Sequence, residues 1–374
     1  MKNIKKISYK SPYWTVALFY ALIAFEFFYM ATPFAVYFYG VYKPFLGFLD
    51  KFPSVSWITG FFLPHLAEDT KSPIINSLKT TGVIIASAGL LTFLICAFQV
   101  YYAKILKKGM VNGGLYKYIR HPQYTAFAVC SFGLLLLWPR YLVLIMFITM
   151  LFAYYLLAKA EESECENRFG EGYLQYKKNT YMFLPVKFHI TYSRIPKTTL
   201  IVGIYVLSLT AALQTAKLIK KASISSLYSG YEKNTVYLSI YKMPETEMDG
   251  IISALNKNRE IRNALEKYNN ENARFINYIL PADMYISEIP MMKPENALCH
   301  VYTSSYSDIY KIVYTTAKFP VPFKSEGKKD VLFNTAGLNP VIEVRYDKNS
   351  NRISDVLLLP AAVSRYENTP EPVF

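Results

Sequence analysis

Long apolar segments alternate with short basic segments up to about residue 220 of the chain. Crossing the hydrocarbon core of a bilayer takes about 20 mostly apolar residues. Segments 13–32, 81–103 and 198–216 meet that requirement. Two shorter apolar runs, 124–138 and 141–158, are separated only by Pro139-Arg140 and predict a tight helical hairpin. The pattern therefore predicts an α-helical integral membrane protein with about five transmembrane helices.

Polar and aromatic residues are mixed between the first two predicted spans. An aromatic stretch continues the first span from residue 33 to 48 and is expected along the membrane interface. Segment 49–78 combines charged residues with Phe61-Phe62-Leu63. It predicts a loop with a short interfacial helix.

The pattern changes from about residue 222. Strict alternation in segment 236–240 indicates a β-strand, and apolar residues on one face predict a helix over 245–268. Further strands are predicted at 275–280, 309–314, 341–346 and 353–359. The chain thus divides into an N-terminal span and interfacial segment (1–78), a membrane core with the last span (79–221), and a soluble α+β domain of unknown role (222–374).

Composition supports a membrane location. Of 374 residues 52% are hydrophobic and 16% aromatic, and the net charge is +14. In a membrane protein such a charge indicates basic cytoplasmic loops, and no recognisable nucleic-acid-binding module is present. The cysteines have no CxxC spacing, so neither disulfides nor a metal site is expected: Cys96, Cys130, Cys165 and Cys299.

The Lys/Arg bias predicts the orientation of the spans. The N-terminal tail and segment 104–120 are both basic, and both are expected on the cytoplasmic side. The hairpin then returns Glu161-Glu162 to that side. The last span would place the C-terminal domain opposite, although Lys217, Lys220 and Lys221 argue against this.

Candidate chemistry lies in two polar clusters at the ends of apolar segments. Segment 113–124 (GGLYKYIRHPQY) places a glycine turn, a cation, an imidazole and three phenols at the start of the hairpin. Pro122 fixes its own φ and disfavours helix at His121, so the chain turns there. Glu161-Glu162 follow the hairpin by about one helical turn. Each cluster alone is typical of an interfacial helix end, but together they indicate a site for a polar, charged ligand beside lipid.

These motifs occur in a specific order. Segment 114–124, a helical hairpin, Glu161-Glu162, segment 169–178 (FGEGYLQYKK) and Phe183-Leu184-Pro185 follow one another. The arrangement over residues 80–186 resembles the isoprenylcysteine carboxyl methyltransferase and phospholipid methyltransferase family, integral membrane enzymes that use S-adenosylmethionine.

The resemblance implies a membrane methyltransferase acting on a lipidic or isoprenoid acceptor, in a bacterial inner membrane or endoplasmic-reticulum-like membrane, with its site facing the cytoplasm. It implies cofactor contacts at these residues: Tyr116, His121, Pro122, Tyr124, Glu161 and Glu162, and, with poorer alignment, Gln99 and the segment from Lys108 to Val111. The catalytic candidates are Glu162, His121 and Arg120. An amine acceptor would need a base, whereas a carboxylate or thiolate would not.

Some positions depart from the family. Ala126 stands where a glycine is frequent, and residues 157–160 (LAKA) stand where the isoprenylcysteine enzymes carry an arginine and acids. These departures argue against a prenylated-cysteine substrate. Two other functions stay open: an NADPH-dependent sterol-type reductase, which shares an Arg-His-Pro-x-Tyr turn, and a non-enzymatic membrane-anchored protein whose C-terminal domain binds a protein partner.

Overall fold

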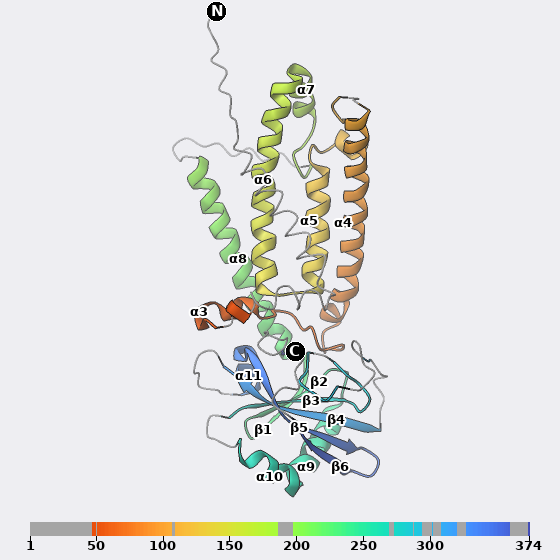
Figure 1. The fold of residues 1–374 in the computed structure, drawn as a ribbon, viewed down its shortest axis with the longest axis vertical. Helices are drawn as coiled ribbons and strands as arrows, with labels where there is room; N and C mark the ends of the chain where they lie inside the picture. Colours follow the sequence, from red (N-terminus) through yellow and green to blue (C-terminus); the bar gives the residue numbers. More distant parts are fainter. Residues whose placement is uncertain are drawn as a thin grey trace, which may run out of the picture.

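The computed structural model describes residues 47–49, 51–106, 109–185, 197–268, 273–286, 288–293, 301, 308–319, 327–359 and 373–374. The predicted first span, most of the predicted interfacial stretch, Lys107, Lys108 and Cys299 lie outside these residues. Four apolar helices run side by side, and a β-sheet lies at one end of them (Figure 1). The helices are α4 (Pro73–Ile105), α5 (Pro122–Leu137), α6 (Tyr141–Phe169) and α8 (Lys197–Ser226).

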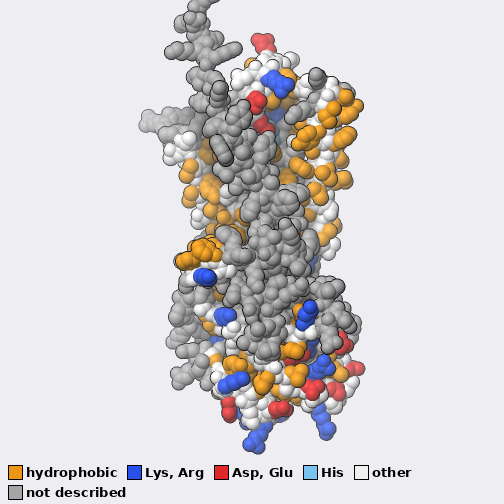
Figure 2. Space-filling model, in the orientation of Figure 1, with side chains coloured by type: hydrophobic (Ala, Val, Ile, Leu, Met, Phe, Trp, Pro, Cys, Tyr) orange, Lys and Arg blue, Asp and Glu red, His pale blue; other side chains and the backbone are white. Residues whose placement is uncertain are grey.

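Three of the described helices are long and apolar enough to cross a membrane: α4, α6 and α8. The hairpin partner α5 has 16 residues, so it is about 24 Å long and shorter than a full span. The count of about five spans is thus not reached within the described residues. Hydrophobic side chains cover the visible outer faces of the helices, and charged ones gather over the sheet (Figure 2). The chain is therefore an integral membrane protein with an added sheet region.

Helices α4 and α5 approach each other through small residues. A Cβ atom added to Gly89 would lie 2.4 Å from the Cys130 nitrogen, and one added to Gly133 would lie 2.3 Å from the Ala86 nitrogen. Without a hydrophobic driving force in lipid, such close backbone packing holds transmembrane helices together. Helix α5 is thereby fixed along α4.

The loop between residues 60 and 72 forms the base of the helices. The predicted short interfacial helix is present as α3 (Pro53–Ser56) and the 3₁₀ turn η1 (Trp57–Thr59). Arg140 is fully buried between α5 and α6. Its guanidinium donates a 2.6 Å hydrogen bond to the Thr59 carbonyl and lies 4.3 Å from the Phe61 ring centre. The Pro139-Arg140 turn is thus tied to this loop.

The C-terminal region is a six-stranded sheet in the order β1 to β6. The strands are β1 (Tyr228–Glu232), β2 (Thr235–Ser239), β3 (Phe275–Pro281), β4 (Ile309–Lys318), β5 (Gly337–Asp347) and β6 (Arg352–Leu358). All neighbours are antiparallel except β2 and β3, which are parallel and joined through α9 (Glu245–Lys257) and α10 (Arg259–Glu266). The sheet and α9, α10 and α11 (Lys328–Asn334) are called the sheet domain below.

The strands at 236–240, 275–280, 309–314, 341–346 and 353–359 agree with the pattern to within a few residues, whereas β1 and α11 had no clear pattern. The helix predicted over 245–268 is broken. Asn258 is extended, with ψ 125°, and its side chain accepts a 3.0 Å hydrogen bond from the Ile261 nitrogen. It caps α10 and so separates it from α9.

The sheet domain packs on the ends of α4 and α8. Helix α8 continues past the predicted end of the span at Ala216 to Ser226, and Ile224 and Leu227 enter the core on one sheet face. Leu66 and Ala67 join the same core, while α9 and α10 cover the other face. Backbone bonds link the Lys71 nitrogen to the Ser226 carbonyl at 2.7 Å. The predicted domain boundaries, at residues 78/79 and 221/222, stay a prediction.

Candidate functional site

The Arg-His-Pro turn before α5 has the geometry that the proline predicts. Pro122 is the first residue of α5, and His121 is its N-cap with φ −122° and ψ 58°. The chain pairs here with the segment after α7 (Glu171–Asn179). The Arg120 nitrogen donates to the Tyr181 carbonyl at 2.8 Å, and the His121 nitrogen donates to the Met182 carbonyl at 3.1 Å. The start of α5 lies at the end of the helices away from the sheet domain (Figure 1).

Helix α6 brings the two glutamates to the same place. It does not end near Ala158 but continues to Phe169, and Gly170 with φ +57° allows the turn into α7. His121 Nδ1 lies 3.5 Å from Glu161 Oε2, and Nε2 lies 3.5 Å from Glu162 Oε1. The imidazole therefore lies between the two carboxylates.

Glu162 is buried in a network of cations. Its side chain is 1% exposed, and Oε1 accepts a 2.7 Å hydrogen bond from Arg120 Nε. Lys177 Nζ lies 2.9 Å from Glu162 Oε2, and Arg120 also donates to the Lys177 and Thr180 carbonyls. A buried carboxylate needs such partners to remain ionised. Glu162 thus joins α6, α7 and the Arg120 turn.

Glu161 differs from its neighbour. Its side chain is 42% exposed, and its Oε1 accepts a 2.6 Å hydrogen bond from the Tyr124 hydroxyl. The Tyr124 ring stacks on His121 at 5.6 Å and on Tyr154 at 4.8 Å between ring centres. The aromatic stack and this hydrogen bond together fix Glu161 and His121 next to each other.

Electrostatics at His121 follow from this placement. Burial lowers the pKa of the imidazole, but the carboxylates of Glu161 and Glu162 outweigh that effect and raise the pKa above its usual value. Burial also lowers the pKa of Lys177, whereas Glu166 and Glu162 raise it, and the net pKa is raised. Charged forms of both groups are therefore favoured.

A cavity of about 710 Å³, here called the polar cavity, opens in front of these groups. It is lined by α4, α5, α6, α7 and the turns between them. Predicted site residues in its wall are Val111, Tyr116, Arg120, His121, Tyr124 and Glu161. Gln99, Pro122 and Glu162 are not in the wall. Gln99 lies beside Gly114, whose added Cβ would come within 2.6 Å of its Nε2, and Glu162 lies behind Arg120 and His121.

Several wall residues had not been predicted as site residues: Gln123, Glu164, Cys165 and Arg168. Gln123 follows Pro122, Glu164 and Cys165 lie one helical turn after Glu161, and Arg168 lies two turns after it. Helical spacing was therefore the available signal. Phe169, the last residue of α6, and Tyr173 and Tyr176 of α7 also line the cavity, so these three aromatic side chains come from two helices. Tyr176 donates a 2.6 Å hydrogen bond to the Tyr116 carbonyl, which ties α7 to the glycine turn.

A second opening, here called the apolar groove, has a volume of about 820 Å³ and lies between α5, α6 and α8. Its walls are aliphatic and aromatic side chains such as Phe132, Phe147 and Leu151. Tyr124 lines both openings. A charged ligand and an apolar one can therefore meet at this side chain.

Part of the chain matches a known family. Residues 80–172 match the model of the phospholipid methyltransferase family. This segment is therefore similar to a methyltransferase-family domain. It covers α4, α5, α6 and the start of α7, and it agrees with the resemblance drawn from the motifs. No match was found among curated proteins, and none among solved structures.

Proposed function

We propose that the protein is a membrane methyltransferase that moves a methyl group from S-adenosylmethionine to a lipidic or isoprenoid acceptor. The observation that carries this proposal is the position of Tyr124. Its ring separates the polar cavity from the apolar groove, and its hydroxyl is bonded to Glu161. A methyltransferase with a soluble donor and a lipid acceptor needs these two openings to meet at one point.

The polar cavity fits the proposed donor in size and charge. Its volume of about 710 Å³ lies within the range of small-molecule pockets. Glu161 offers an exposed carboxylate that can face a sulfonium or a ribose diol. Tyr116, Tyr173 and Tyr176 offer aromatic faces for a purine ring. Val111 and Ala103 supply apolar wall on the α4 side.

S-adenosylmethionine supplies an activated methyl group on a cationic sulfur when it is bound. The chain's own residues then have to hold the cation, align the acceptor and exclude water. Glu161 binds the cation, and Tyr124 fixes the orientation of Glu161 by its hydrogen bond. The apolar groove seats the acceptor chain and keeps water from the transfer point.

The other predicted catalytic residues take different parts. Glu162 lies behind the cavity wall, where it pairs with Arg120 of that wall and faces His121, so it acts as a positioning residue for both side chains. His121 lines the cavity and, when neutral, is the group placed to accept a proton from an amine acceptor. A carboxylate or thiolate acceptor would leave the imidazole with an electrostatic role only.

The orientation follows from the basic residues near the site. Segment 109–120 and the start of α5 lie at the end of the helices away from the sheet domain (Figure 1). Lys117 and Arg120 lie there, and the Lys/Arg bias places that end in the cytoplasm. The sheet domain would then lie on the other side of the membrane. We also propose that this domain binds a protein partner.

The test is binding of S-adenosylhomocysteine to the purified protein by calorimetry, followed by incubation with labelled S-adenosylmethionine and membrane lipids. We expect micromolar binding that Glu161→Gln and His121→Ala abolish, and a labelled lipid identified by mass spectrometry. Glu171→Gln, on the outer side of α7, is the matched control. Unchanged binding in both site variants, or reduction of a sterol with NADPH in place of methylation, would refute the proposal.

A further inference from the structure

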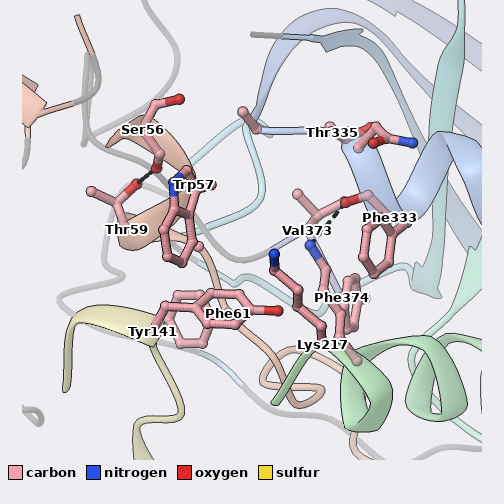
Figure 3. A pocket seen from close by; sticks show the side chains of 14 residues that line it. Ser56, Trp57, Thr59, Phe61, Tyr141, Lys217, Phe333, Thr335, Val373 and Phe374 are labelled. Carbon is pink, nitrogen blue, oxygen red and sulfur yellow. Dashed lines mark hydrogen bonds between the residues drawn. The ribbon is translucent and has the colours of Figure 1, made fainter. Parts of the chain in front are cut away.

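A second cavity lies at the opposite end of the helices, where they meet the sheet domain (Figure 3). This junction cavity has a volume of about 250 Å³. Its wall combines the α3–η1 segment, the start of α6, the last turns of α8, the end of α11 with the two residues after it, and Val373 with Phe374. Because it lies far from His121 along the helices, it is separate from the proposed methyl-transfer site.

Two lysines of α8 give the junction cavity its charge. Lys217 and Lys220 both line it, one helical turn apart. Lys220 Nζ donates a 2.9 Å hydrogen bond to the Phe333 carbonyl, and Lys217 Nζ lies 5.7 Å from the Trp57 ring centre. Figure 3 shows the Lys217 side chain next to the cavity, between Phe61 and Phe374.

The lysines lack an acidic partner in the described part of the chain. None of the ion pairs that described residues form with one another includes Lys217 or Lys220. The Lys220 ammonium lies near two aromatic rings: its Nζ is 4.9 Å from the Phe333 ring centre and 5.8 Å from the Phe374 ring centre. Two cations that line one cavity and lack an acidic partner among the described residues favour an anion in the space between them.

The position of the cavity identifies the kind of anion. Lys217 follows directly on the apolar stretch of α8, so it lies at the level where a membrane span ends. Phe48, Phe52 and Trp57 expose their rings close to α3, as aromatic residues do at the membrane–water interface. Lysines at that depth meet the phosphate groups of lipids.

We propose that the junction cavity binds the phosphate of an anionic phospholipid in the leaflet next to the sheet domain. Lys217 and Lys220 are its cationic ligands, and Trp57 and Tyr141 pack beside the headgroup. Since the wall includes Phe333 and Thr335 of the sheet domain as well as α8, the bound lipid also joins that domain to the membrane helices. This proposal is independent of the methyl-transfer reaction.

The experiment is native mass spectrometry of the full chain released from nanodiscs, together with thermal unfolding in detergent with added lipid. Phosphatidylglycerol should remain bound at one copy and raise the unfolding temperature, and phosphatidylcholine should not. We expect roughly fivefold weaker binding for Lys217→Gln or Lys220→Gln and at least tenfold weaker binding for the double variant. Lys221→Gln, an exposed lysine on the same helix that does not line the cavity, should bind as the unchanged protein does.

Three results would overturn the proposal. The first is equal binding of both lipids. The second is full retention of phosphatidylglycerol by the double variant. The third is stabilisation by inorganic phosphate alone with no effect of the lipid, which would make the cavity a site for free phosphate. Lys220→Gln can fail to fold because its hydrogen bond to Phe333 is lost. In that case Lys217→Gln and Trp57→Ala provide the test, since Lys217 makes no hydrogen bond to the sheet domain among the described residues.

Discussion

The Tyr124 hydroxyl donates a 2.6 Å hydrogen bond to Glu161 Oε1, and the same ring stacks on His121. One side chain thus orients both groups that face the polar cavity. Tyr124→Phe keeps the stack and removes only the hydroxyl. Hydrogen bonds to charged groups contribute about 1.5–3 kcal/mol, so S-adenosylhomocysteine should bind roughly 10- to 100-fold more weakly.

Calorimetry measures this change, and Tyr155→Phe serves as the matched control because Tyr155 lines the apolar groove but not the polar cavity. Equal affinity of Tyr124→Phe and the unchanged protein would show that Glu161 does not need its tyrosine partner to bind the ligand.

Glu162 holds together three segments that are far apart in sequence. Its carboxylate pairs with Arg120 and Lys177, and the side chain is 1% exposed. Glu162→Gln keeps the shape but leaves Arg120 without this buried counter-charge, whereas Lys177 keeps its contact with Glu166. Removing one partner of a buried pair costs about 3–5 kcal/mol, so the free energy of unfolding should fall by about that amount.

Thermal or denaturant unfolding in detergent provides the measurement. Glu164→Gln, an exposed neighbour on α6 with no ion pair among the described residues, should change stability by less than about 0.5 kcal/mol. If Glu162→Gln were as stable as Glu164→Gln, the network would not be a structural support of the site.

The ionisation of the His121 imidazole predicts that the stability of the folded protein depends on pH. Its pKa in the folded protein is raised, because Glu161 and Glu162 favour the charged form more than burial disfavours it. Since the folded pKa lies above the unfolded one, the contribution to stability is full below about pH 6.5 and is lost as the pH rises through the folded pKa. Arg120 and Lys177 also face the carboxylates.

The measurement is the difference in unfolding temperature between the unchanged protein and His121→Gln as a function of pH. We expect the difference to be largest in mildly acidic solution and to shrink toward alkaline pH. A difference that grows with pH would mean that the neutral imidazole is the form that the site stabilises.

Much of this architecture was predictable from local pattern. The Arg-His-Pro turn fixed the start of α5 at Pro122 because a proline suits the first helical position. Short apolar segments located five of the six strands, and alternation marked one of them. The order of the motifs predicted the methyltransferase-family segment, which the family match over residues 80–172 confirms.

Other features depend on contacts that no local pattern contains. The sequence shows two adjacent glutamates, but it does not contain the contacts with Arg120 and Lys177 that bury Glu162 while Glu161 stays partly exposed. That difference arises because α7 folds back at Gly170, which places Lys177 beside Glu162 and not beside Glu161. Likewise, the continuation of α8 into the core of the sheet domain depends on burial of Ile224, which the hydropathy of the span does not reveal.

The close approach of α4 and α5 predicts a strong effect of two small substitutions. A Cβ atom at Gly89 would lie 2.4 Å from the Cys130 nitrogen, and one at Gly133 would lie 2.3 Å from the Ala86 nitrogen. Backbone atoms cannot move aside as a flexible side chain can, so the helices must separate. Overpacking costs about 1–3 kcal/mol for each site, and Gly89→Val and Gly133→Val should lower the unfolding temperature accordingly.

The separation should also weaken the site, because Val100 and Ala103 of α4 and Tyr124 of α5 form opposite walls of the polar cavity. We therefore expect weaker S-adenosylhomocysteine binding in both variants, although neither glycine contacts the cavity. Gly203→Val is the control on α8, since nothing lies within 4 Å of a Cβ at that position. Normal binding and stability in Gly89→Val would mean that the helices are not held at the distance described here, and Tyr124 would then have no fixed place between the two openings.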